Sequence, residues 1–339
     1  MEIRRNIDPI EICKKVSDKD ITSLSKAITL VESTNKSDRL IANKILSELQ
    51  NKNERNTIRI GVTGVPGAGK STFIETFGTK LTEMGKRVAV LTIDPSSSIS
   101  KGSILGDKTR MEKLSQNKNV FIRPTAASNF QGGVAKNTRE SIFLCESAGY
   151  DIIIIETVGV GQNEISVSEM VDFFLLLKIA GSGDELQGIK RGIIEMSDLI
   201  AINKSDGDNV ENSEKSKNEF QLALKLFPIK SSQWTPKVLT CSALSGKGLN
   251  EIWNSIEDYT VLTKKNNYFY QNRINQNKFW LKQMINESIQ RSFYENNSVK
   301  VEFEKQLKKI EQGKTSVFEA TQFLLSLSLI HISEPTRPS

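Results

Sequence analysis

The eight residues from Gly64 through Ser71 constrain the fold of this chain more than any other part of the sequence. They read GVPGAGKS and fit the pattern G-x-x-x-x-G-K-[ST] at every fixed position. The apolar run IRIGV comes before them and the run STFIETF, which has helical character, comes after them. A chance glycine-rich turn is the alternative, but it would not need a strand and a helix on its two sides. The motif therefore predicts a phosphate-binding P-loop in an α/β domain.

The P-loop positions have distinct predicted roles in binding a nucleotide with Mg²⁺. Glycines let backbone N–H groups turn toward phosphate oxygens, and the N-terminus of the next helix adds a favourable dipole. We expect Lys70 to reach the β- and γ-phosphates as a catalytic group and Ser71 to ligate Mg²⁺. The loop residues predicted to contact the nucleotide are Gly64, Val65, Pro66, Gly67, Ala68, Gly69, Lys70, Ser71 and Thr72.

A second motif predicts which base the bound nucleotide carries. Asn203, Lys204 and Asp206 form N-K-x-D directly after the apolar run LIAI. An aspartate carboxylate can accept hydrogen bonds from N1 and N2 of guanine, and adenine offers no such pair of donors. Alone the motif is equally typical of a solvated turn, but its place after a strand and downstream of a P-loop favours guanine. A loop like the S-A-[KL] loop of G proteins follows the next predicted strand, at Ser242, Ala243 and Leu244.

Three carboxylates are candidates for the metal and the catalytic chemistry. Glu156 ends the apolar run in DIIIIETVGVGQNE, where a carboxylate can hold Mg²⁺, and the Gly159 N–H can sense the γ-phosphate. Asp94 ends the run VLTID, and strand ends of a parallel sheet meet at the edge that holds the P-loop. Asp107 lies in a further polar loop. For Asp94 and Asp107, capping of a loop is the alternative role.

Short apolar runs alternate with longer helical runs between residues 57 and 260. The predicted strands are 58–62, 88–93, 120–122, 152–156, 173–177, 199–202 and 238–240. Several are continuously apolar, which is typical of strands buried on both faces of a parallel sheet. The predicted helices between them are 71–84, 134–148, 186–196, 212–226 and 249–259. This alternation predicts an α/β fold with a doubly wound, mostly parallel sheet.

The remaining segments predict helical extensions on both sides of this domain. Residues 1–56 have helical periodicity, with Asp20 as an N-cap, and residues 261–325 contain predicted helices at 272–296, 301–311 and 315–325. Such a polar extension must bury its apolar stripe against the core or against a second copy of the chain. Residues 326–339 break the pattern and are interpreted as an atypical tail, either non-native or an ordinary frayed terminus.

Composition narrows the functional classes. The net charge of +6, from 46 basic and 40 acidic residues, is too weak a bias to indicate nucleic acid. Three scattered cysteines and a single histidine, His331, exclude a histidine triad and a disulfide framework from the body of the chain. Because neither a secretory signal nor a run long enough to cross a membrane is visible, we expect a cytoplasmic protein.

Taken together, these stretches resemble the MeaB/ArgK family, the GTPases associated with methylmalonyl-CoA mutase within the SIMIBI class of P-loop proteins. The resemblance runs in order over about residues 20–325. Two loops depart from the family pattern, at Ala180 and after Pro124. The matching stretches are GVPGAGKST, LTIDPSSSISKGSILGDKTRM, GGVAKNTRE, ETVGVGQNE, GSGDELQGIKRGIIE, NKSDGDN and SALSGKGL.

The resemblance implies a GTPase that binds Mg²⁺ with GTP or GDP and acts as a chaperone of an adenosylcobalamin-dependent acyl-CoA mutase. It also implies a homodimer formed through the C-terminal helical arm, and switch regions at 94–107, 156–164 and 181–190. For 181–190, a static cap at Asp184 is the simpler alternative.

Three other functions stay open at this point. One is a kinase or ATPase linked to transport of lysine, arginine or ornithine, against which the guanine motif argues. A metallochaperone GTPase is another, although the chain has no segment rich in His or Cys. The third is a nucleotide-binding module that does not hydrolyse GTP, which a turnover assay would distinguish.

Overall fold

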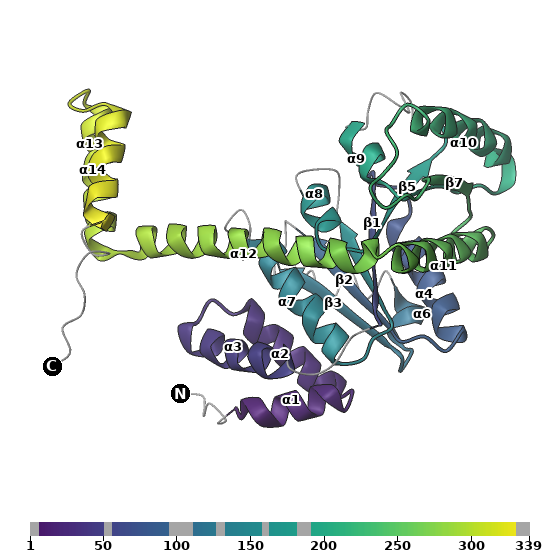
Figure 1. Ribbon diagram of the computed structural model, residues 1–339, viewed down its shortest axis with the longest axis horizontal. Coiled ribbons are helices and arrows are strands. Elements are labelled where there is room, and N and C mark those ends of the chain that lie inside the picture. Colours follow the sequence, from purple (N-terminus) through teal and green to yellow (C-terminus); the bar gives the residue numbers. More distant parts are fainter. Residues whose placement is uncertain are drawn as a thin grey trace. The chain divides into compact units, whose positions relative to one another are not determined.

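A computed structural model describes residues 7–50, 56–94, 111–126, 133–157, 163–181 and 191–329 (Figure 1). Its contacts divide the chain into two compact units, one ending at Gln276 and the other beginning at Asn277. The boundaries predicted after residues 56 and 260, between the P-loop domain and its helical extensions, stay predictions.

The first unit is built on a seven-stranded sheet whose neighbouring strands are all parallel. The strand order is β3-β2-β4-β1-β5-β6-β7. The connection after β1 runs toward β2 on one side, and the connection after the neighbouring β5 runs toward β6 on the other side. The end of β1 therefore lies at a topological switch point. The predicted α/β doubly wound fold and its seven strands are confirmed. The strands are β1 (Ile58–Gly64), β2 (Val88–Asp94), β3 (Val120–Ala126), β4 (Ile152–Thr157), β5 (Phe173–Ile179), β6 (Leu199–Asn203) and β7 (Lys237–Thr240).

Helices cover the sheet because its strands are apolar on both faces. Every residue of β4 is buried, for example, including the adjacent Ile154 and Ile155. The core on one face joins Ile60 of β1 to Phe73 and Trp253 of the helices that follow β1 and β7. The connecting elements are α4 (Lys70–Glu83), α6 (Glu112–Ser115), α7 (Gly133–Ser147), α8 (Asn163–Ser168), α9 (Arg191–Met196), η1 (Gly207–Asn209), α10 (Val210–Leu224) and α11 (Leu249–Lys265). The predicted helix at 186–196 is described from Arg191 onward.

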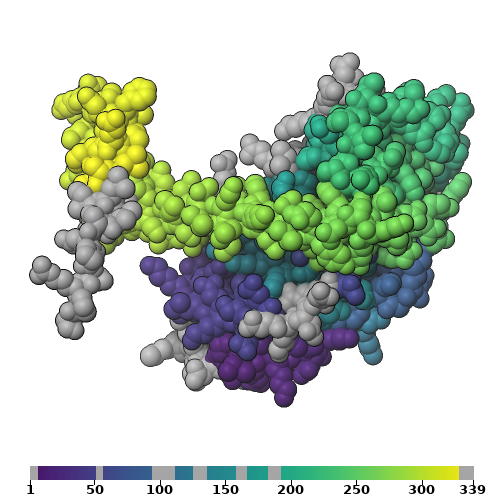
Figure 2. Space-filling view, in the orientation of Figure 1, coloured from purple at the N-terminus to yellow at the C-terminus, as the bar shows by residue number. Residues whose placement is uncertain are grey.

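The N-terminal helices pack against α7, as the purple and teal ribbons of Figure 1 show. They are α1 (Pro9–Ser17), α2 (Ile21–Glu32) and α3 (Lys36–Gln50). Asp20 caps α2 as predicted, because its carboxylate accepts a hydrogen bond from the Ser23 N–H at 2.7 Å. Arg39 of α3 donates two hydrogen bonds to the Glu140 carboxylate of α7, at 2.9 and 3.0 Å. Figure 2 shows these purple helices as a closely packed group.

The helix α12 (Tyr268–Glu295) begins in the first unit, and the second unit contains its remainder with α13 (Asn297–Glu311) and α14 (Val317–Leu329). The last two helices pack on each other and bury Val299 and Leu324. Residues 326–329 continue α14, so the helical pattern does not end at the predicted place, and residues 330–339 lie outside the described chain. Within the described residues, every helix is too short or too polar to span a lipid bilayer.

Candidate nucleotide-binding site

The P-loop leaves the end of β1 at the switch point of the sheet, where two positions require glycine. Gly64 has a φ of 155°, and a Cβ there would lie 2.3 Å from the Leu177 carbonyl oxygen of β5. Gly69 has a φ of 83°, and its Cβ would lie 2.8 Å from the Asn203 side-chain nitrogen. Glycine therefore lets the loop pass close to β5 and to the predicted guanine loop.

Lys70 spans this loop from the first turn of α4. Its buried ammonium donates hydrogen bonds to the carbonyl oxygens of Gly64, at 2.7 Å, and Val65, at 3.2 Å. These contacts hold the cation over the loop whose glycines leave the backbone open to a ligand. Phosphate oxygens are stronger acceptors for an ammonium than carbonyl oxygens. The arrangement suits a lysine that binds phosphate.

Asn203 connects the P-loop to the loop after β7. Its side-chain nitrogen donates to the Ala68 carbonyl at 2.8 Å, and its side-chain oxygen accepts from the Ala243 N–H at 2.9 Å. The hydroxyl of Thr76, on α4, also donates to the Ala243 carbonyl at 2.7 Å. Asn203, the first residue of the N-K-x-D motif, therefore ties the two loops together. Thr76 was missed because a threonine inside a helix has no motif of its own.

The other predicted base-binding residues gather around the same pair of loops. The Asp206 carboxylate accepts a hydrogen bond from the Ser242 hydroxyl, which orients it. Lys204 adopts a left-handed φ of 59°, and its Cε lies 4.0 Å from the position of a Cβ on Gly69. Leu244 is exposed at the edge of the loop. An oriented carboxylate beside a lysine stem is the arrangement that reads guanine and packs on its ring.

The predicted metal ligands Ser71 and Glu156 lie together. The Ser71 hydroxyl donates to the buried Glu156 carboxylate at 3.2 Å. Beside them, the Thr157 hydroxyl donates to the Thr63 hydroxyl at 2.9 Å and links β4 to β1. The sequence analysis did not predict the pair of Thr157 and Thr63, since the two residues are far apart in sequence. Two oxygen groups held side by side fit the preference of Mg²⁺ for oxygen ligands.

Other predicted site residues are only partly placed. Asp94 is the last residue of β2, beside β4 in the sheet, and its side chain is not described. Asp107, Gly159 and residues 182–190 lie outside the described chain. Their roles stay predictions.

A P-loop at the switch point of a parallel sheet, joined by Asn203 to the loop that carries the N-K-x-D motif, is the arrangement of a P-loop GTPase. Comparison with known proteins identifies the group within that class. The model of the family described as "Methylmalonyl Co-A mutase-associated GTPase MeaB" matches residues 24–298, and the chain belongs to this family. It binds guanine nucleotides and hydrolyses GTP.

Individual proteins give the same result. The chain is 46% identical over 311 residues to the mouse "Methylmalonic aciduria type A homolog, mitochondrial", covering 89% of this chain and 75% of that protein. It is 44% identical to "GTPase ArgK" of Escherichia coli, covering 84% and 86%. A solved structure described as an LAO/AO transport system kinase has a TM-score of 0.75 at 34% identity, covering 97% of this chain and all of that one.

Proposed function

We propose that this GTPase is a chaperone of an adenosylcobalamin-dependent acyl-CoA mutase of the methylmalonyl-CoA mutase type. GTP hydrolysis would gate loading of the cofactor and protect the mutase from inactivation. The observation that carries the proposal is the match of residues 24–298 to a family described by its association with that mutase. The name of the mouse relative, which refers to methylmalonic aciduria, agrees with it.

The nucleotide site supplies the chemistry for the GTP hydrolysis that would gate loading of the cofactor. Lys70 binds and orients the phosphates, while Asn203 holds the P-loop against the base-reading loop. We propose that Ser71 and Glu156 hold Mg²⁺, since their oxygens already face each other at 3.2 Å. When bound, the ion neutralises charge that develops on the phosphates. Asp94, Asp107 and Gly159 are proposed to complete this site.

GTP turnover with and without a purified adenosylcobalamin-dependent acyl-CoA mutase tests the proposal. We expect the mutase to raise turnover by ~tenfold or more, because partners commonly accelerate GTPases by ordering the catalytic loops. Lys70→Ala is the control, since it removes phosphate binding and with it any stimulation. A mutase that acts without cobalamin should have no effect. If no cobalamin-dependent acyl-CoA mutase stimulates the wild type, the chaperone function is wrong.

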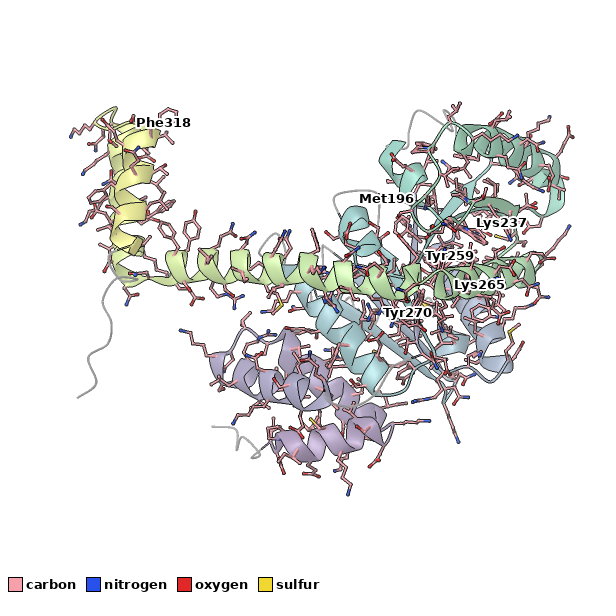
Figure 3. The ribbon with its side chains drawn as sticks, viewed as in Figure 1. Met196, Lys237, Tyr259, Lys265, Tyr270 and Phe318 are labelled. Atoms are coloured by element: carbon pink, nitrogen blue, oxygen red, sulfur yellow. The ribbon has the colours of Figure 1, made fainter. Side chains whose placement is uncertain are left out.

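We also propose that the chain forms a homodimer through its C-terminal helices. Leu281, Ile285 and Ile289 are spaced by four residues on α12 and are all exposed, so they form an apolar stripe along the helix. Phe318 of α14, labelled in Figure 3, is 83% exposed. Apolar side chains spaced in this way favour helix–helix association.

Light scattering on two variants tests the dimer. Leu281→Glu combined with Ile289→Glu should give a monomer that still binds GTP, because both side chains lie outside the nucleotide site. Asn286→Glu, at an exposed polar position of the same helix, is the matched control and should leave the dimer intact. A double variant that remains dimeric would place the interface elsewhere.

An enzyme that uses ATP in amino-acid transport is the second candidate, favoured by the description of the solved relative. Competition of ATP with GTP distinguishes the two, because the oriented Asp206 should exclude adenine.

A cytoplasmic location is proposed as well. It is consistent with three cysteines that are all buried and form no disulfide.

A further inference from the structure

A threonine of the P-loop helix joins that helix to the loop after β7. The Thr76 hydroxyl, on α4, lies 2.7 Å from the Ala243 carbonyl oxygen and 3.1 Å from the carbonyl oxygen of Thr72 in its own helix. Threonines inside helices commonly donate to the carbonyl four residues back. Because a hydroxyl has a single hydrogen to donate and the Ala243 oxygen is the nearer acceptor, the stronger hydrogen bond of Thr76 leaves the helix.

The methyl group of the same side chain lies beside the turn of this loop. Gly246 has a φ of 78°, and its N–H donates to the Ser242 carbonyl at 2.9 Å, which closes the turn. The Thr76 Cγ2 lies 3.8 Å from the position that a Cβ on Gly246 would take, an ordinary van der Waals distance. Thr76 therefore approaches the loop of residues 242–246 with two different groups, a hydroxyl and a methyl.

Ala243 is held at both polar groups of its backbone. The residue is buried, with 3% of its surface exposed. Its N–H donates to the Asn203 side chain at the end of β6, at 2.9 Å, and its carbonyl accepts from Thr76 on α4. Buried backbone groups nearly always have partners, and the loss of a partner costs free energy. Asn203 thus fixes the N–H side of this residue, and Thr76 fixes the carbonyl side.

The contact connects the two halves of the nucleotide site. Lys70 and Ser71, proposed for the phosphates and the metal, begin α4, and Thr76 follows about two turns later on the same helix. Ser242 belongs to the loop that Thr76 contacts, and its hydroxyl donates the hydrogen bond that orients the Asp206 carboxylate. Because a helix is stiff over this length, Thr76 sets the distance between the start of α4 and the carboxylate predicted to read guanine.

We infer that Thr76 is a positioning residue for base recognition, which rests on the role predicted for Asp206. The Thr76 hydroxyl fixes the loop 242–246, so that the Asp206 carboxylate meets N1 and N2 of guanine while the P-loop holds the phosphates. The hydroxyl acts through Ala243 and not on the base directly. Loss of this hydroxyl therefore weakens nucleotides that carry a base. It also lowers the preference for guanine over bases that offer Asp206 fewer donors.

Thr76→Val tests this role, because valine keeps the methyl group and the shape of threonine and removes the hydroxyl. We expect the affinity for GDP, measured by calorimetry on the full chain with Mg²⁺, to fall about fivefold. Thr76→Ser keeps the hydroxyl and should bind GDP as the wild type does. Thr79→Val is the matched control on the same helix. The Thr79 hydroxyl donates to the Glu75 carbonyl inside α4, at 2.8 Å, so its loss should leave GDP affinity as in the wild type.

The preference for guanine separates a positioning role from a general loss of structure. Asp206 can accept a hydrogen bond from N2 of guanine, and hypoxanthine lacks that amino group. GDP should therefore bind the wild type tighter than inosine diphosphate does, and Thr76→Val should lower the ratio of the two affinities about threefold. Both affinities come from one preparation, so an unfolded fraction does not alter their ratio. Pyrophosphate with Mg²⁺ has no base and should bind the wild type and Thr76→Val equally.

Asp206→Asn, measured beside these variants, shows which assignment fails if the result differs. If Asp206→Asn lowers the ratio and Thr76→Val leaves it unchanged, Asp206 remains the base-reading residue and Thr76 has no part in recognition. If neither variant changes the ratio, both assignments are wrong. A loss of pyrophosphate affinity equal to the loss of GDP affinity would also overturn the role of Thr76, because the residue would then support the P-loop. A Thr76→Ser variant that binds GDP as weakly as Thr76→Val would do the same.

Discussion

The two edges of the parallel sheet hold polar side chains for different purposes. At the carboxyl edge, Lys70 and Glu156 contact neighbouring groups of loops that are shaped to receive a ligand. At the amino edge, Asp172 and Arg273 lie in ion pairs that the protein completes by itself. The comparison teaches that a buried charge held beside an open ligand loop points to function. A buried charge that pairs with an opposite charge of the same protein points to the joining of segments.

The amino-edge pairs join segments that are distant in sequence. The Asp172 carboxylate, before β5, accepts hydrogen bonds from the Arg273 side chain of α12 at 2.8 and 2.6 Å. It also accepts one from the Arg59 N–H of β1 at 2.8 Å. The Arg59 side chain donates two hydrogen bonds to the Glu146 carboxylate of α7, at 2.8 and 3.0 Å. This network holds the first turns of α12 to the strand that carries the P-loop.

Asp172→Asn breaks this network and should have the largest effect on stability. Removing one charge of a buried pair leaves the other without a partner, which costs about 3–5 kcal/mol. Urea denaturation should show this loss in the free energy of unfolding, while GTP affinity of the folded protein is unchanged. Asp258→Asn is the control, since it breaks the exposed pair with Lys237 and should cost about 0–1 kcal/mol. Equal losses in the two variants would show that the amino edge is not a stabilising network.

Asp206→Asn tests the carboxyl edge. We expect it to change nucleotide affinity and not stability, with an effect smaller than that of Asp172→Asn. Loss of a charged contact to guanine costs about 1.5–3 kcal/mol, or roughly ten- to hundredfold in GTP affinity. Xanthosine triphosphate should gain affinity, because its base presents an acceptor to the new amide. Nucleotide titrations measure both changes, with Asp208→Asn of η1 as the control. A variant that loses stability rather than specificity would make Asp206 a structural residue like Asp172.

Sequence patterns predicted the two edges unequally, for a physical reason. Ligand loops are contiguous, so Gly64 through Ser71 and Asn203 through Asp206 could be identified as motifs, and the apolar strands predicted the sheet that brings them together. Arg273 and Asp172 are 101 positions apart, and their pairing depends on the docking of α12. The same is true of Tyr259 of α11, whose ring packs edge-on against Phe173 of β5 and Trp234 only in the folded protein. Partners that only the fold brings together have no local signal.

Cys241 extends the comparison of the two edges. Its thiol is potentially reactive and lies at the carboxyl edge, where we expect burial to protect it from chemical modification. It is 1% exposed and lies in the loop that contacts Asn203. Burial raises its pKa to about 12, and the nearby Asp206 carboxylate adds to the effect. At pH 9 an ordinary thiol, with a pKa of about 8.5, is mostly the reactive thiolate. A thiol with a pKa of about 12 is only about one-thousandth thiolate.

Alkylation with iodoacetamide at pH 9 should therefore leave Cys241 unmodified in the native protein and modify it in urea, as mass spectrometry of the peptides would show. The raised pKa also fixes the sign of a small pH effect on stability. Above about pH 8.5 the unfolded thiol loses its proton and the folded thiol keeps it, so the free energy of unfolding falls as pH rises. Cys241→Ser should reduce this slope, as denaturation at pH 8 and pH 10 would measure. Rapid native alkylation would mean that this loop opens, and the carboxyl edge would then be less tightly joined than its hydrogen bonds indicate.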